Sequence, residues 1–123
     1  MESSMDLDLP SEADSPATVR RALRDFAHLL TPQELEDLQL VFSELVSNSI
    51  RHAGLSPKDL IKIHLEITDH LIRGAVADGG PGIIHEGPPY GRGYGLQILD
   101  RLATRWGTSD HSRAQVWFEI ERH

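Results

Sequence analysis

Two polar side chains, Glu44 and Asn48, stand four positions apart in an otherwise amphipathic stretch of the chain. If the stretch is helical, this spacing puts them one turn apart, about 40° from each other around the axis. A carboxylate can accept a proton, and an amide oxygen is a hard ligand of the kind that Mg²⁺ prefers. The pair suits a magnesium-nucleotide site, and a solvated helix face with an incidental Asn explains this helix equally well.

A third polar position, Asp78, follows a predicted buried strand and precedes Gly80 and Gly82. A carboxylate there can accept a hydrogen bond from an exocyclic amine such as that of adenine, and the glycines would leave room for a flat base. A tight turn that uses Asp and Gly for backbone reasons is the more ordinary interpretation of this segment alone.

Three alternating glycines, Gly91, Gly93 and Gly95, open a predicted helix. Amide groups at such a helix start can converge on phosphate oxygens. The motif is weak by itself, because it lacks the Lys-Ser/Thr of a P-loop and no strand leads directly into it, as a Rossmann fold would require.

Hydrophobic periodicity predicts the elements that must position these groups. A first helix begins with Ser15 as its N-cap, and a capping box at Thr31 and Glu34 starts a central helix that ends at Gly54. Another helix from residue 96 ends near Trp106. Strands are predicted over residues 61–67, 71–77 and 114–120, and a further one over residues 105–109.

The expected fold is a two-layer α/β (α+β) sandwich, with a mixed, mainly antiparallel sheet and the helices packed on one face. Residues 1–14 are acidic and have few apolar side chains, so we expect a disordered head there. A single domain is expected to occupy residues 15–123.

Composition narrows the class of protein. The chain has 123 residues, 19 acidic against 12 basic side chains, a formal net charge of -7 and no cysteine. Direct nucleic-acid binding is disfavoured, because it relies on Lys and Arg, and disulfides or thiolate metal sites are excluded. The chain shows neither an apolar run long enough to cross a bilayer nor a secretory signal, so we expect a cytoplasmic protein that does not bind membranes.

In chain order, the helix with Glu44 and Asn48, the strand that ends at Asp78, and the glycine run before a helix resemble the GHKL superfamily of ATP-binding domains (Bergerat or HATPase-like fold). The phrases SELVSNSIRHAG, GRGYGLQILDRLATRWG and VWFEI are similar to those of the anti-sigma-factor serine/threonine kinases of bacteria. The resemblance covers about residues 16–121.

The resemblance implies ATP and Mg²⁺ as cofactors. Asn48 would coordinate Mg²⁺, and Glu44 would act as the general base of phosphoryl transfer or orient the attacking hydroxyl or water. A lid would span residues 83–90. The other implied contacts are Arg51 and His52 near the phosphates, Asp78, Gly80 and Gly82 at the adenine, and Gly91, Arg92, Gly93, Tyr94 and Gly95 at the end of the lid.

The implied function is a regulatory kinase that transfers the ATP γ-phosphate to Ser or Thr of a partner and controls transcription by partner switching. The partner would be an anti-sigma-factor antagonist-like protein, a sigma factor, or both, and a homodimer is compatible with the sequence. One alternative is a non-catalytic nucleotide-dependent switch, which a short lid without a basic residue before Arg92 favours. Another is a catalytic subunit that serves a separate histidine phosphoacceptor.

The first helix carries Arg20 and Arg24, a candidate docking surface for an acidic partner. The acidic head is a candidate intramolecular competitor for this basic surface.

Overall fold

The computed structural model describes residues 2–52, 60–78, 96–109 and 115–122. The strands are β1 (Ser3–Pro10), β2 (Leu60–Ile67), β3 (Leu71–Asp78), β4 (Arg105–Ser109) and β5 (Gln115–Glu121). The helices are α1 (Ser15–Leu23), a short 3₁₀ helix η1 (Arg24–Leu29), α2 (Pro32–His52) and α3 (Leu96–Leu102).

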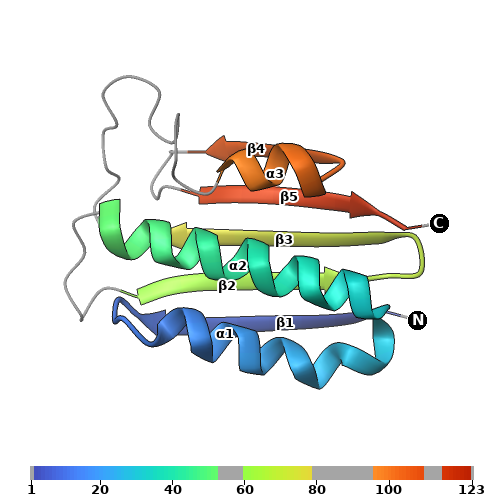
Figure 1. The fold of residues 1–123 in the computed structure, drawn as a ribbon, viewed down its shortest axis with the longest axis horizontal. Coiled ribbons are helices and arrows are strands. Elements are labelled where there is room, and N and C mark those ends of the chain that lie inside the picture. Colours follow the sequence, from blue (N-terminus) through green and yellow to red (C-terminus); the bar gives the residue numbers. More distant parts are fainter. Residues whose placement is uncertain (1, 53–59, 79–95, 110–114, 123) are drawn as a thin grey trace.

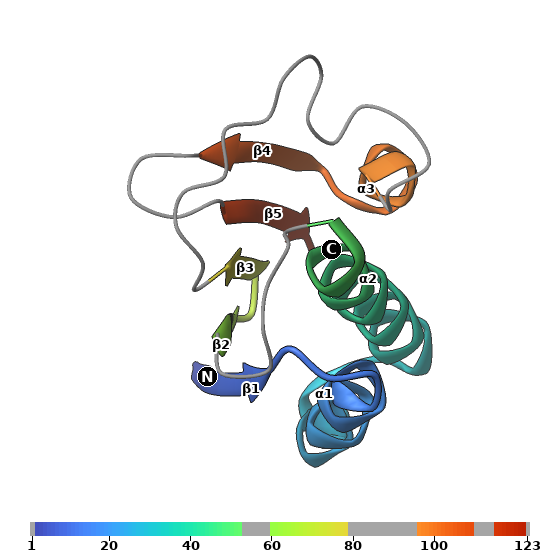
Figure 2. The same ribbon diagram turned by 90° about the vertical axis from the view of Figure 1, so that its left-hand side faces the viewer.

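The five strands form one sheet in the order β1-β2-β3-β5-β4. The helices cover one face of this sheet, and the other face carries no helix of the described chain (Figures 1 and 2). The predicted two-layer sandwich is therefore confirmed. Each of the four described strand pairings is antiparallel, so the mixed component of the predicted sheet is not seen in them.

The N-terminal residues form an edge strand, and the prediction of a disordered head over residues 1–14 is wrong. β1 pairs with β2 along all of its eight residues, from Ser3 opposite Ile67 to Pro10 opposite Leu60. The physical reason is a period-two alternation within an acidic segment. Its apolar members, Met5, Leu7 and Leu9, pack on the core.

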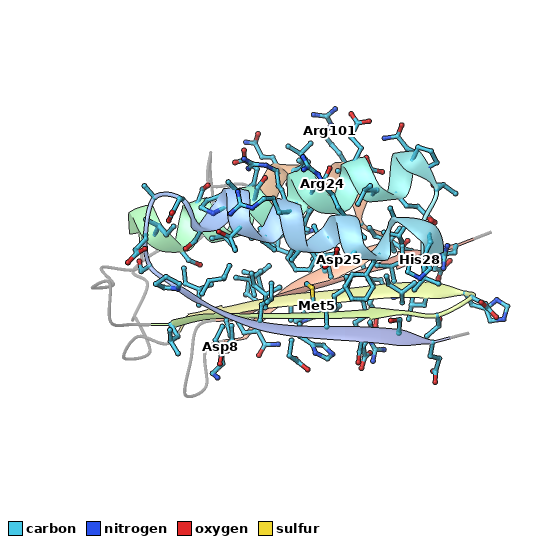
Figure 3. All side chains as sticks on the ribbon, turned by 90° about the horizontal axis from the view of Figure 1, so that it is seen from below. Met5, Asp8, Arg24, Asp25, His28 and Arg101 are labelled. Carbon is cyan, nitrogen blue, oxygen red and sulfur yellow. The ribbon has the colours of Figure 1, made fainter. Side chains whose placement is uncertain are left out.

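The carboxylates of β1 lie on the open face of the sheet, away from the helices. Figure 3 shows Met5 on the helix side, Asp8 on the opposite side and Arg24 on the outer side of the helix layer. Asp6 and Asp8 therefore do not cover the arginines of α1. The interpretation of these two residues as competitors for that basic surface is wrong.

The helix starts follow local chemistry, with one correction. The capping box is confirmed, since the Thr31 amide donates to Glu34 Oε1 (2.9 Å) and the Glu34 amide to Thr31 Oγ1 (3.0 Å). Ser15 is not an N-cap, because Asp14 occupies that position and Ser15 Oγ instead donates to the carbonyl oxygen of Pro10 at 2.6 Å. This bond ties β1 to α1.

The helix predicted from residue 96 ends earlier than expected. α3 stops at Leu102, and Trp106 belongs to β4, where it pairs with Phe118. Trp106 Nε1 donates to Asp100 Oδ1 at 2.8 Å and so fastens α3 to β4. The further strand predicted over residues 105–109 is confirmed.

The core lies between α2 and the centre of the sheet. The rings of Phe42 and Phe118 meet edge to face, with centroids 5.3 Å apart, and both are fully buried. Gly74 on β3 lies directly beneath them. Both the helices and the strands contribute the rest of the core. Its buried apolar residues are Leu9, Val19, Leu23, Leu38, Val41, Leu45, Val46, Ile61, Ile63, Leu65, Ile67, Ile72, Val76, Leu99 and Val116.

Gly74→Ala is expected to destabilise the fold strongly. A Cβ atom at this position would stand 2.7 Å from Phe118 Cε1 and 2.8 Å from Phe42 Cζ, inside van der Waals contact with two packed rings. Overpacking of this kind typically costs about 1–3 kcal/mol. Urea unfolding measures the change, with Ala75→Ser on the open face as the matched control. Equal stability of Gly74→Ala and wild type would show that the rings of Phe42 and Phe118 can move aside without loss of stability.

Arg122 fastens one end of the molecule. Its guanidinium donates to both carboxylate oxygens of Glu34 (3.1 and 3.0 Å), to the Leu29 carbonyl (2.9 Å) and to the Thr68 carbonyl (2.7 Å). Burial opposes ionisation of Glu34, but hydrogen bonds from Thr31 and Arg122 hold its pKa below the ordinary value. The start of α2 and the turn between β2 and β3 are therefore held together.

Candidate functional site

α2 and β3 run in the same direction and finish at the same end of the molecule (Figure 1). The Arg122 contacts hold the first turn of α2 beside Thr68, at the turn where β3 is about to begin. β3 then runs to Asp78, which lies opposite Ile61 of β2. The last turns of α2, which contain Asn48, and the last residue of β3 therefore lie at the end opposite to Arg122.

α3 begins at this same end. The Thr104 amide donates to the Glu119 carbonyl at 2.7 Å, and β4 continues from there until Ser109 lies opposite Gln115. Gln115 in turn pairs with Ala77, next to the end of β3. Since α3 runs back along β4, its first residue is directed toward the end of β3 (Figure 1). The end of α2, the end of β3 and the start of α3 thus lie at one end of the molecule.

Asn48 is the most unusual residue at this end. It is only 2% exposed, and its Oδ1 has no hydrogen-bond partner within the described part of the chain. Leaving such an acceptor buried and unpaired costs about 1–3 kcal/mol. An Asn that is poorly suited to a helix interior, buried with a free oxygen, is the arrangement expected of a ligand-binding group.

Glu44 lies one turn before Asn48 on α2, about 6 Å along the axis. It is partly exposed, so a substrate can reach its carboxylate from solvent while Asn48 stays buried below. This arrangement offers a reachable proton acceptor beside a fixed amide oxygen.

The other predicted site residues are only partly covered by the structure. Arg51 and His52 occupy the last positions of α2, and Asp78 the last position of β3, but their side chains lie outside the described residues. The lid over residues 83–90 also lies outside them. The same holds for Gly80, Gly82, Gly91, Arg92, Gly93, Tyr94 and Gly95, whose roles stay predictions.

The described residues fit a metal that arrives with a nucleotide. Among them, no group of three or more His, Asp or Glu side chains could hold a metal ion by itself. Mg²⁺ on a nucleotide needs few protein ligands, since phosphates and waters fill most of its coordination sphere. The unpaired Oδ1 of Asn48 is a suitable ligand of this kind.

One polar cluster on the open face was missed by the sequence analysis. The period-two alternation of residues 61–67 places His64 on the polar face of the predicted strand and gives it no function. In the structure it lies between Asp6 of β1 and Glu66 of β2. Only the alternation of acidic and apolar residues over positions 3–10 could have predicted this, by identifying β1 as a strand.

Comparison with known proteins gives consistent results. Residues 9–119 match the family described as "Histidine kinase-like ATPase domain". Proteins named "Anti-sigma F factor" from two strains of Clostridium botulinum are 35% identical over 85 residues, which is 67% of this chain and 59% of those proteins. The protein of that name from Pasteuria penetrans is 32% identical over 84 residues, 65% of this chain and 56% of its own length. The matches thus span less than two thirds of these relatives.

A solved structure shows the same fold. The crystal structure of the RsbU and RsbW domains of Rv1364c from Mycobacterium tuberculosis superposes with a TM-score of 0.74 and covers 98% of this chain and 33% of that one. At 19% sequence identity, this likeness concerns the fold alone. Within the described residues, no helix is both long and apolar enough to cross a membrane.

Proposed function

This chain belongs to the histidine kinase-like ATPase domain family, and from that premise we propose that it binds Mg-ATP where α2, β3 and α3 converge and transfers the γ-phosphate to Ser or Thr of a partner protein. The observation that carries the proposal is the buried Oδ1 of Asn48 on the last turns of α2, which has no hydrogen-bond partner among the described residues. A purely structural helix gains nothing from this atom, whereas a bound magnesium ion would satisfy it.

Each residue of the site has a distinct role in this proposal. Asn48 would hold the magnesium ion, which when bound supplies neutralisation of phosphate charge. Asp78, at the end of β3, would receive the adenine amino group. Arg51 and His52, at the end of α2, would lie near the phosphates, and the glycine-rich segments would shape the base pocket and the lid.

The chemistry of the chain itself centres on Glu44. Its partly exposed carboxylate would accept the proton of the incoming Ser or Thr hydroxyl, one turn from the group that positions the nucleotide. Phosphoryl transfer needs mainly positioning and charge neutralisation, so one base held beside a fixed nucleotide is a sufficient protein contribution.

The proposed biological role is regulation of transcription through partner switching in the cytoplasm. It is supported by the relatives named anti-sigma F factor. An anti-sigma-factor antagonist-like protein or a sigma factor would be the partner, and a homodimer the working unit. Arg20 of α1 and Arg24, the first residue of η1, are exposed, and we propose this surface for docking of an acidic partner. Figure 3 shows Arg24 on the outer side of the helix layer.

Mg-ATP is expected to raise the melting temperature of the purified protein. A ligand that binds only the folded state adds about 2.7 kcal/mol at one hundred times its dissociation constant, which is about 10 °C for a domain of this length. Differential scanning fluorimetry measures the shift, with ATP in excess EDTA and Mg-GTP as controls. An unchanged melting temperature at millimolar Mg-ATP would rule out the proposed site.

A transfer assay separates the kinase from its alternatives. Labelled γ-phosphate should appear on the partner as an acid-stable phosphoester if Ser or Thr is the acceptor. An acid-labile product would identify a histidine acceptor instead. ATP binding without any transfer would favour the non-catalytic switch, which is suggested by a lid that has no basic residue before Arg92.

A further inference from the structure

His64 lies midway along β2 on the open sheet face, with a carboxylate at each ring nitrogen. Its Nδ1 lies 2.7 Å from Asp6 Oδ1 of β1, and its Nε2 lies 3.2 Å from Glu66 Oε1 of its own strand. A neutral imidazole has one N–H, so it can donate to only one of these groups and turns a lone pair toward the other. The imidazolium donates to both. The geometry is therefore matched to the protonated ring.

The surroundings of His64 leave these two carboxylates as its closest charges. Directly opposite on β3 is Ala75, which does not titrate. Arg73, the nearest cation of β3, reaches Glu66 at 3.8 Å and lies closer to Glu119 of β5, at 2.7 Å. The cation of β2, Lys62, contacts Asp8 of β1 at 3.3 Å. The β5 side chains that share a hollow with His64 are the uncharged Gln115 and Trp117, and Glu119, which is paired with Arg73 and Arg105.

We propose that His64 is a proton-operated clasp that holds the N-terminal strand β1 on the sheet, closed when the ring carries two protons and loosened when it loses one. β1 is the edge strand, and β2 is its only neighbour among the described strands. Besides the backbone ladder, the described side-chain links across this pair on the open face are Asp6–His64 at 2.7 Å and Asp8–Lys62 at 3.3 Å, both open to solvent. Loss of the first leaves the edge strand with the longer of the two links.

The clasp also acts on α1. Pro10, the last residue of β1, accepts the Ser15 hydroxyl at 2.6 Å, so a shift of β1 is transmitted to the start of this helix. α1 packs on α2 through the buried Val19 and Leu23, carries the exposed Arg20 and continues into η1 at the exposed Arg24. Loosening of β1 is therefore expected to change the order of a helix at the surface, with or without nucleotide.

The direction of the pH dependence follows from the contacts of His64. The hydrogen bond with Asp6 raises its pKa above the ordinary 6.5, partial burial opposes this, and Glu66 adds to the rise. A group whose pKa is raised by folding stabilises the folded state fully below its ordinary pKa. This stabilisation is lost as the pH rises through the folded-state pKa, so the clasp opens on the alkaline side of 6.5.

Hydrogen exchange of the nucleotide-free protein tests the clasp. Protection factors for the backbone amides of residues 3–9, corrected for intrinsic exchange, are expected to fall between pH 6 and pH 8.5, by up to about tenfold for each unit by which folding raises the pKa of His64. In His64→Gln, the protection factors should be low at every pH in this range, like those of the wild type at pH 8.5. In His64→Lys, which stays cationic over the range, they should be high at every pH, like those of the wild type at pH 6. His70→Gln, at an exposed histidine of the β2–β3 turn, should behave as wild type.

A direct titration makes the test independent of folding defects in any one variant. The pKa of His64, followed by NMR, should fall in Asp6→Asn and in Glu66→Gln. A pH-independent protection of the amides of residues 3–9 in the wild type, or an unchanged His64 titration in both carboxylate variants, would overturn the proposal. Neither measurement uses ATP, so failure of the clasp and failure of the proposed kinase function remain distinct.

Discussion

Glu44→Gln is expected to slow phosphoryl transfer to the partner by about 10²–10⁴-fold, while Mg-ATP still raises the melting temperature. The amide keeps the shape of the side chain at a partly exposed position of α2 but cannot take the proton of an attacking hydroxyl. In the proposed site, binding would depend on other groups, chiefly Asn48 and the end of β3, so it should persist. Single-turnover transfer of labelled phosphate measures the loss, and fluorimetry the retained binding.

Glu36→Gln is the matched control for this experiment. It removes the same charge from the same helix, at an exposed position two turns before Glu44, and should leave transfer unchanged. A pH–rate profile adds a second readout, because loss of a base should remove the rise of the rate with pH in the acidic range. Normal transfer by Glu44→Gln would show that Glu44 is not the base. Loss of nucleotide binding in the same variant would indicate a structural role instead.

The elements that the sequence predicted well are those whose signals are local. The alternation over residues 61–67 and the capping box of Thr31 and Glu34 both act within a few residues, and the structure has β2 and the start of α2 where these signals lie. Each signal reflects a physical requirement, half-burial for the strand and unpaired amides for the helix start, that is met by neighbours in the chain.

The elements that were predicted wrongly depend on partners far away in the chain. β1 is stabilised by β2, with Ser3 opposite Ile67, and an acidic segment gains its place in the sheet only from that pairing. Trp106 continues an apolar helical pattern, but pairing with Phe118 places it in β4. In both cases long-range strand pairing overrides a local propensity or composition.

The sequence could predict which residues belong to the candidate site, but not how deeply each is buried or which hydrogen bonds it makes. The order of Glu44, Asn48, Asp78 and the glycines identified the family, and the structure brings the ends of α2 and β3 to one end of the molecule. That Asn48 is almost fully buried with an unpaired oxygen follows from the packing of α2 and has no local sequence signal. The same holds for the contact of Arg122 with Glu34, which joins residues 88 positions apart.

Asn48→Leu is expected to change stability and binding in opposite directions. Leucine has a similar branched shape, removes a buried acceptor without a described partner, and favours the helix more than Asn does. The nucleotide-free variant should therefore unfold with a free energy about 1 kcal/mol higher than wild type. Its affinity for Mg-ATP should fall by more than about 100-fold, because even the outer partners of metal ligands are worth about 10–100-fold.

Opposite signs in one variant distinguish a ligand-binding residue from a packing residue. Ser49→Ala, at the neighbouring buried position of α2, is the control, because it also improves helix propensity yet should leave Mg-ATP binding intact. Urea unfolding without nucleotide and calorimetric titration with Mg-ATP measure the two effects. If Asn48→Leu binds Mg-ATP like wild type, Asn48 is not the magnesium ligand. If the nucleotide-free variant is strongly destabilised, the amide oxygen already serves the fold, and the buried acceptor no longer argues for a bound ion.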